Sequence, residues 1–242
     1  MSAAQPTPEG GAVRGDRNRL IDRLPAADRR RLLDRCQPVA LALSSVLCEA
    51  GRPTRHVYFP TTGFVSLVRH VDDHPGVEVG MVGREGMLGV QLALGVATAP
   101  LHALVQGPGR AWRMAAPAFR AELVASPALQ RGLQRYLYVL MAQLATSAAC
   151  LRFHAIGPRL ARWLLMSQDR AQADRFGMTQ AFLAYMLGVR RVGITAAASD
   201  LQRRGLIAYR RGELEVLDRA GLEAAACSCY DADRRTYAAL LG

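Results

Sequence analysis

The segment that decides the fold is residues 178–218, which read MTQAFLAYMLGVRRVGITAAASDLQRRGLIAYRRGELEVLD. Thr179 is a residue type that favours the N-cap of a helix. The apolar side chains of residues 180–187 recur at helical spacing, and Gly188 follows them with the backbone freedom for a sharp turn. A second helix is predicted over residues 190–204. Two short helices joined by a glycine turn are typical of a helix-turn-helix.

The predicted second helix is amphipathic and is followed by a hairpin. Its apolar side contains Ala197, Ala198 and Leu201 together with either Val192 or Ile194. Downstream, residues 206–209 and 214–217 have the composition of short strands, and the sequence Arg-Arg-Gly-Glu joins them. This hairpin is predicted to form a wing beside the two helices.

Arginine supplies the positive charge of the chain and is concentrated in this segment. All 31 basic residues are Arg, against 20 acidic residues, so the formal net charge is +11. An excess of this kind favours a polyanionic partner, although GC-rich coding also produces an all-arginine inventory. Between Gly188 and Gly212 six Arg accompany a single acidic residue, Asp200. We therefore predict that the segment binds double-stranded DNA, with the start of the second helix in the major groove.

Individual residues of the segment have different predicted roles. Arg191 and Thr195 are expected to reach base edges or phosphates from the start of the second helix. Arg210 and Arg211 are expected to contact backbone phosphate from the hairpin. Val192 either meets a thymine methyl group or packs inside. The predicted DNA-binding set is Thr179, Gln180, Arg190, Arg191, Val192, Thr195, Arg203, Arg210 and Arg211.

The preceding part of the chain divides into a β-rich region and a long helix. Between Val39 and Met114, short apolar or alternating runs are separated by Gly and Pro, which predicts a β-sandwich or barrel. Pro127 opens a long helix with leucines at the heptad spacing of a coiled-coil seam. Such a helix either pairs with a second copy or lies on its own domain, and the heptads favour pairing. The predicted dimer interface is Leu133, Leu137, Leu140, Leu144 and Leu151.

From about Leu20 to its end, the chain resembles the CRP/FNR family of bacterial transcription regulators. The most specific segments are Leu183–Arg191, reading LAYMLGVRR, and Leu201–Ile207, reading LQRRGLI, together with the glycine-punctuated strands before Met114. The resemblance implies an α+β fold with an N-terminal, cyclic-nucleotide-binding-like β-roll, a long dimerisation helix and a C-terminal winged helix-turn-helix. It also implies a homodimer that contacts RNA polymerase and catalyses no reaction.

The expected domain boundaries follow from these features. The predicted units are a disordered N-terminal segment (1–16), an effector domain (17–125), a dimerisation helix (126–156) and a winged helix-turn-helix domain (157–242). The N-terminus lacks the basic-then-apolar order of a secretory signal, and no uninterrupted apolar stretch of membrane-spanning length is present. We therefore expect a cytoplasmic protein without a membrane partner.

The chain departs from the family pattern where cyclic nucleotides bind. Members that bind them carry a Gly-Glu pair for the ribose and an Arg-Ser/Thr pair for the phosphate. Here Gly89-Val90 and Leu101-His102 stand at those positions. A buried phosphate would therefore lack its cation, and we predict that the chain does not bind cyclic nucleotides. The effector is unidentified, and the candidate pocket positions are Glu85, Gly89, Val90, Leu101 and His102.

The five cysteines do not form a recognisable cofactor motif. Cys36 and Cys48 are the only two in the N-terminal half, too few for an iron-sulfur cluster there. The Cys227-Ser228-Cys229 sequence is a weak metal signal, and Cys150 with His154 has the spacing of a helical ligand pair for haem or metal. We interpret the cysteines as structural thiols and the histidine as a hydrogen-bonded residue. No metal or cofactor is expected.

Two other function classes share some of these sequence features. An enzyme acting on a nucleotide or phosphorylated substrate would also use a basic surface, but the chain has no P-loop, no G-x-S-x-G and no H-E-x-x-H sequence. No catalytic residues are predicted. A scaffold that only pairs through its long helix would leave the arginine-rich helix-turn-helix unexplained.

Overall fold

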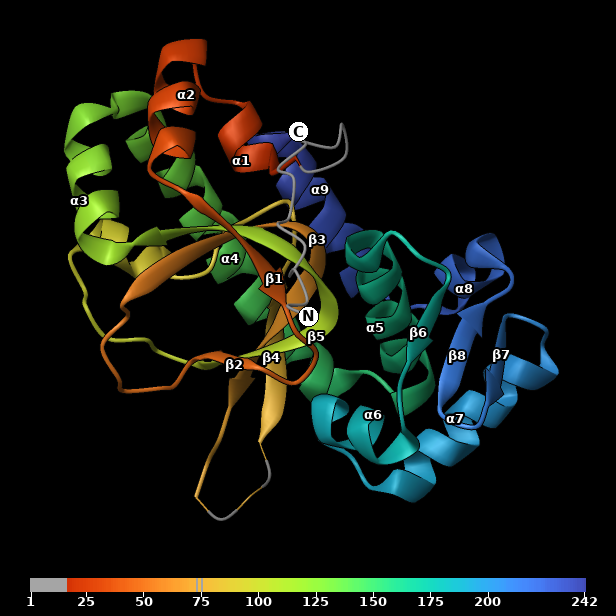
Figure 1. Cartoon of the computed structure of the whole chain (residues 1–242). Coiled ribbons are helices and arrows are strands. Elements are labelled where there is room, and N and C mark those ends of the chain that lie inside the picture. Colours follow the sequence, from red (N-terminus) through yellow and green to blue (C-terminus); the bar gives the residue numbers. More distant parts are fainter. Residues whose placement is uncertain (1–16, 73, 75) are drawn as a thin grey trace, which may run out of the picture.

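The computed structural model describes residues 17–72, 74 and 76–242, so the segment 1–16, predicted to be disordered, lies outside the described residues (Figure 1). An antiparallel sheet forms the N-terminal part, in the order β1-β5-β3-β4, and β2 also pairs with β5. Its strands are β1 (Gln37–Leu41), β2 (Val46–Cys48), β3 (His56–Arg69), β4 (Val77–Val82) and β5 (His102–Ala115). The β-rich prediction for this region is confirmed.

Short helices precede the first strand, connect β4 to β5 and follow β5. They are α1 (Arg19–Asp22), α2 (Ala26–Asp34), the 3-10 helix η1 (Val90–Leu94) and α3 (Ala116–Ala125). The Asn18 side chain caps α1 and donates hydrogen bonds to the carbonyl oxygens of Pro60 and Gly86, at 2.9 and 2.8 Å. This buried amide fixes the start of the described chain on the sheet, because each of its polar atoms has a backbone partner.

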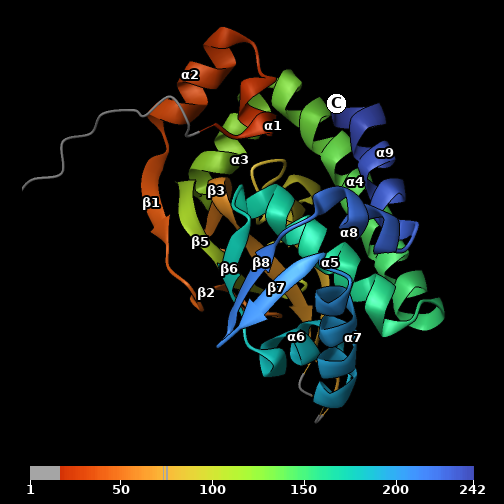
Figure 2. The ribbon, with the colours of Figure 1, turned by 90° about the vertical axis from the view of Figure 1, so that its right-hand side faces the viewer.

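The long helix α4 (Pro127–Phe153) crosses the β-roll and leads into α5 (Ile156–Ala171). Ser126 caps α4 by accepting from the Leu129 backbone N–H at 3.1 Å. Pro127 occupies the first helical position, where its missing N–H is not needed. The C-terminal helix α9 (Cys229–Leu241) runs beside α4, as Figure 2 shows. Its end is tied to α1, because Arg23 donates hydrogen bonds to the carbonyl oxygens of Leu241 and Gly242.

The C-terminal part is a small helical domain with a three-stranded sheet ordered β6-β8-β7. Its elements are β6 (Arg175–Gly177), α6 (Gln180–Leu187), α7 (Arg191–Arg203), β7 (Ile207–Arg210), β8 (Glu213–Val216) and α8 (Arg219–Ala225). One hydrophobic cluster joins this part to the β-roll: Phe64 and Met81 of the sheet pack with Trp163 and Leu164 of α5. The two parts therefore share buried apolar surface as well as a covalent link.

One helix of the described chain, α4, is long and apolar enough to cross a membrane by length and composition. Helices of folded domains pass the same test, and α4 packs against β4 and α9. The α6–α7 pair passes only when taken as one span with a 108° bend. That bend is the turn of the helix-turn-helix.

Candidate DNA-binding surface

Helix α6 begins and ends where the sequence predicts. The Thr179 hydroxyl accepts a hydrogen bond from the Phe182 backbone N–H at 3.1 Å and so satisfies a free donor of the first turn. Gly188 ends the helix with φ +62°, a conformation that costs little without a Cβ atom. Leu183 and Met186 fill the core between α6 and the rest of the domain. The prediction of a helix over residues 180–187 is confirmed.

The structure resolves which side of α7 is buried. Ile194 is fully buried, whereas the Val192 side chain is 73% exposed. Of the two residues that the spacing allowed, Ile194 is therefore the core residue. Gly193 lets α7 lie close to α5, since a Cβ atom at this position would be 2.6 Å from Cδ1 of Ile156. Arg190, the N-cap residue, is exposed at the start of the helix.

One face of α7 is open to solvent. It carries the exposed residues Arg191, Val192, Thr195, Ala196, Ser199, Gln202 and Arg203. These positions recur every three or four residues, so they form a continuous strip along the helix. The Thr195 hydroxyl donates to Oε1 of Gln180 at 2.7 Å, which holds two predicted DNA-binding side chains together between α6 and α7.

The wing is a tight hairpin. Arg211 and Gly212 connect β7 to β8 with φ +52° and +82°, the positive φ values of a two-residue type I′ turn. Strand β7 begins and ends one residue later than the predicted 206–209, and β8 begins and ends one residue earlier than the predicted 214–217. The wing is fixed to the start of α6, because Met178 donates its backbone N–H to the Gly212 carbonyl and accepts from the Tyr209 hydroxyl at 2.9 Å.

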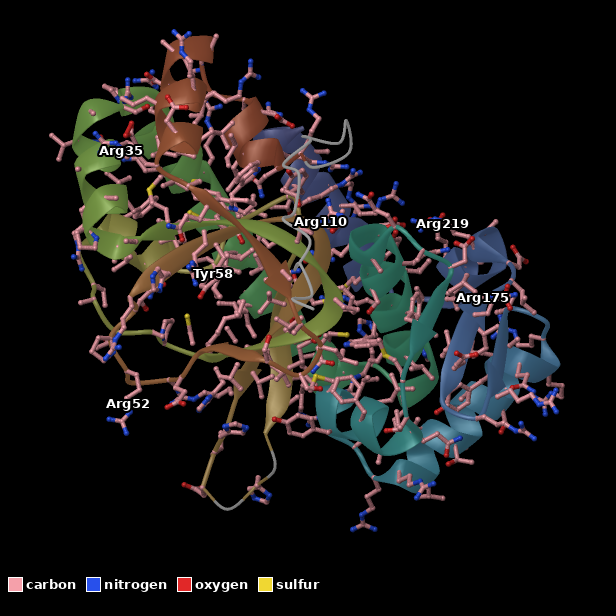
Figure 3. The ribbon with its side chains drawn as sticks, viewed as in Figure 1. Arg35, Arg52, Tyr58, Arg110, Arg175 and Arg219 are labelled. Atoms are coloured by element: carbon pink, nitrogen blue, oxygen red, sulfur yellow. The ribbon has the colours of Figure 1, made fainter. Side chains whose placement is uncertain are left out.

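Strand β6 was not predicted. Arg175 of this strand, labelled in Figure 3, forms an ion pair with Glu215 at 3.0 Å. Phe176 pairs with Leu214 in the ladder. A three-residue strand has too short a pattern to distinguish it from a loop, and it gains its structure from pairing with β8.

The arginines differ in the partners that they have within the chain. Within the described residues, Arg190, Arg191, Arg210 and Arg211 have no carboxylate at ion-pair distance. Arg203 is paired with Asp200, and Arg204 lies 3.5 Å from the same carboxylate. The charge that remains uncompensated is therefore concentrated at the start of α7 and at the tip of the wing.

Three of the five predicted pocket positions line one cavity. Gly89, Val90 and Leu101 border a cavity of about 640 Å³ between the β-roll and α4. Glu85 lies elsewhere and forms an ion pair with Arg170 at 2.7 Å. His102 also lies outside this cavity, with its ring centroid 4.5 Å from that of His70. These two predicted positions therefore do not border the cavity that the other three share, and Glu85 instead borders a second cavity with Tyr136 and Leu140 of α4.

The five leucines predicted as a dimer seam do not all face outward. Leu133 is 1% exposed within a single chain and packs in the core of the β-roll, so it cannot contact a partner. The remaining predicted positions are partly buried: Leu137, Leu140, Leu144 and Leu151. The most exposed large apolar residues on this helix before its last turn are Tyr138 and Met141. Sequence spacing identified the helix but not the side that faces solvent.

Comparison with known proteins agrees with this architecture. Residues 158–225 match the model of the Crp-like helix-turn-helix domain. A putative transcriptional regulator of the CRP/FNR family from Eubacterium rectale is similar in fold, with a TM-score of 0.66 and 14% identity over 85% of this chain and 96% of that one. FixK2 from Bradyrhizobium japonicum has a TM-score of 0.67 and 15% sequence identity, over 80% of this chain and 98% of that one.

A CRP-family transcriptional regulator from Thermus thermophilus gives a TM-score of 0.63 and 21% identity, over 78% of this chain and 96% of that one. No curated protein matches the chain. A β-roll, a long helix and a winged helix-turn-helix are therefore the architecture that this chain shares with those proteins. The C-terminal residues 158–225 match a Crp-like helix-turn-helix domain, and the chain as a whole shares its fold with solved regulators of the CRP/FNR family.

Proposed function

We propose that the protein binds a roughly palindromic DNA duplex as a homodimer and acts as a transcription regulator in the cytoplasm. The observation that carries this proposal is the set of arginines without carboxylate partners at the start of α7 and at the wing tip. Figure 2 shows α7 close to the β7–β8 hairpin. In this proposal the N-terminal turn of α7 enters the major groove and the wing contacts the adjacent backbone. RNA polymerase, as a further partner, remains a prediction from the family.

The exposed residues of α7 divide into two roles in this proposal. Arg191 and Val192 lie on the first turn, where side chains reach base edges and thymine methyl groups. Arg210 and Arg211 lie at the hairpin and contact phosphates, which fixes orientation without reading sequence. The first turn of α7 has no acidic residue, so a carboxylate contact to cytosine is not part of its readout.

Selection of bound sequences from a pool of random duplexes tests this function. We expect enrichment of one palindrome with half-sites about one helical turn, roughly 10 base pairs, apart. The Leu183→Asp variant, which disrupts the helix-turn-helix core, is the matched control and should enrich nothing. A wild-type protein that enriches no sequence would contradict the proposal.

The exposed stripe of α4 is the proposed dimer interface. Tyr138, Met141, Ala145 and Ala148 follow one another at steps of three, four and three residues and are all exposed. This is the heptad spacing of a helix that pairs with another helix. The stripe lies one residue beyond the leucine series, on a neighbouring face of the helix. Small residues at 145 and 148 permit close approach of a second helix. Leu137, Leu144 and Leu151 flank this stripe and would be covered at its edge.

We propose that the cavity between the β-roll and α4 is the effector site and that its ligand is largely apolar with an anionic head. Leu137, Leu140, Met141 and Leu144 of α4 form one wall, so an occupant touches the proposed dimer helix directly. Arg69 is the only charged side chain among the described residues that line the cavity. No carboxylate is present there for a ribose, which supports the expectation that cyclic nucleotides do not bind.

The ligand class is tested with anilinonaphthalene sulfonate, a fluorescent apolar anion. Its fluorescence should rise on binding, and the Val90→Trp variant, which fills the cavity from η1, should abolish the rise. The exposed Val124→Trp variant is the control for the added indole and should leave the rise intact. Displacement of the probe by micromolar cyclic AMP would contradict the assignment.

A further inference from the structure

Four potential metal ligands from distant parts of the sequence meet beside the junction of α4 and α5. Cys150 lies in the last turn of α4, and His154 is the residue that caps its C-terminus. Cys227 and Cys229 lie where α8 leads into α9. The three cysteines are buried and form a separate small cluster. The sequence suggested the Cys150–His154 pair and the Cys-x-Cys pair separately, and the fold unites them.

The distances suit one shared ion. The four ligand atoms all lie within 4.8 Å of one another. Sγ of Cys150 is 3.5 Å from Sγ of Cys227, and Sγ of Cys229 is 3.5 Å from Nδ1 of His154. Tetrahedral coordination with Zn–S bonds of about 2.3 Å and Zn–N bonds of about 2.0 Å separates neighbouring ligand atoms by roughly 3.5 to 3.8 Å.

We propose that Cys150, His154, Cys227 and Cys229 bind one Zn²⁺ ion in a closed structural site. Three sulfurs and one imidazole nitrogen are a ligand set typical of structural zinc, and four protein ligands leave no position for substrate or water. A polynuclear iron-sulfur cluster needs its ligands spread around several iron atoms, whereas these four converge on a single point. The proposal does not depend on DNA binding.

The surroundings match the charge of such a site. Binding releases the three thiol protons to solvent, so three thiolates and Zn²⁺ carry a net charge of −1. The Arg159 and Arg162 guanidinium groups of α5 lie near enough for their charges to act on Cys150 and Cys227. Nε of Arg162 is buried without a hydrogen-bond partner, and so is available to a thiolate. Arg162 is also paired with Asp233 at 2.7 Å, so Arg159 supplies the positive charge that balances the site.

The position of the ion gives it a structural consequence. Cys150 and His154 belong to the end of α4, and Cys227 and Cys229 belong to the segment that returns α9 along it. The Cys227 backbone N–H also donates to the Pro158 carbonyl at 3.3 Å, which ties the same segment to the first turn of α5. An ion here would fix the angle at which the winged domain leaves the long helix.

Metal analysis of the full chain, purified with reductant, tests the site. We expect one zinc ion per chain, released in step with thiol blocking by a mercurial reagent. Replacement by Co²⁺ should give the thiolate charge-transfer and visible bands of tetrahedral coordination. The Cys229→Ser and His154→Ala variants should lose stoichiometric metal. The Cys36→Ser/Cys48→Ser variant removes the two cysteines outside the cluster and should retain it.

Two results would overturn the proposal, and both can be read from the wild-type chain even if a variant fails to fold. The first is reduced protein that binds neither Zn²⁺ nor Co²⁺ after incubation with the metal ions. The second is a Cys150–Cys227 disulfide that persists in the purified chain and whose reduction restores no metal binding. Stoichiometric zinc in a chain that binds no DNA would leave this inference standing and contradict the proposed function alone.

Discussion

Glu78 of β4 connects the β-roll to the winged domain and predicts a specific dependence of stability on pH. Its Oε1 atom accepts a hydrogen bond from Nε1 of Trp163 on α5 at 3.0 Å, and its other oxygen accepts from the Ser66 hydroxyl. Burial raises the pKa of this carboxyl from 4.5 to about 7, although both hydrogen bonds and the charges of Arg170 and Arg162 act in the opposite direction.

The direction of the pH effect follows from the raised pKa. Between about pH 4.5 and pH 7 the folded chain holds a proton that the unfolded chain has released, so the free energy of unfolding falls as pH rises. The stabilisation of the folded chain by protonated Glu78 is fully present below about pH 4.5 and is lost as the pH rises to about 7. Each pKa unit corresponds to about 1.4 kcal/mol, so the loss is at most about 3 kcal/mol, reduced by remaining contact with solvent.

The Glu78→Gln variant isolates this contribution, because Gln is neutral at every pH and keeps an oxygen that can accept from Trp163. We expect urea unfolding of the wild-type chain at pH 5 and pH 8 to show a decrease in stability that is larger than that of the variant by about 1–3 kcal/mol. Parallel stability curves for the two proteins would refute the assignment of a raised pKa to Glu78.

Three substitutions test packing and assembly. Leu133→Ala should cost about 2–5 kcal/mol of stability and leave the oligomeric state unchanged in sedimentation, since the side chain is enclosed by its own chain. Met141→Arg should yield monomers, and a dimer that survives it would move the interface away from the exposed stripe of α4. Gly193→Val would place a Cβ atom 2.6 Å from Cδ1 of Ile156, the end of a side chain that can rotate away, so we expect it to cost at most about 1 kcal/mol, measured as a lower Tm. Gly132→Ala, which has open space around its position, is the control helix substitution and should not destabilise the chain.

The helix-turn-helix could be predicted because its signals are local. A threonine cap, a glycine turn and apolar residues at helical spacing all lie within a few residues of the elements that they determine. The wing was also predicted, to within one residue at each strand. The choice between Val192 and Ile194 required the structure, since both fit the same helical face and only the packing against α5 separates them.

The remaining features depend on contacts between distant segments. Leu133 and Met141 both fit a heptad series, and which of them faces the β-roll depends on how α4 lies across the sheet. The Cys and His residues near α9 are about 75 positions apart, so their convergence could not be read from spacing. Strand β6 and the effector cavity likewise form only when separate elements meet.

The most direct test of the central claim is the affinity of the full chain for its selected operator and for a scrambled duplex over a range of salt concentrations. The wild type should prefer the operator and bind more weakly as salt rises. Arg191→Ala should reduce the preference, whereas Arg211→Ala should weaken both duplexes alike and lower the salt slope by about one. Equal losses on both duplexes for both variants, or an affinity indifferent to salt, would contradict the account.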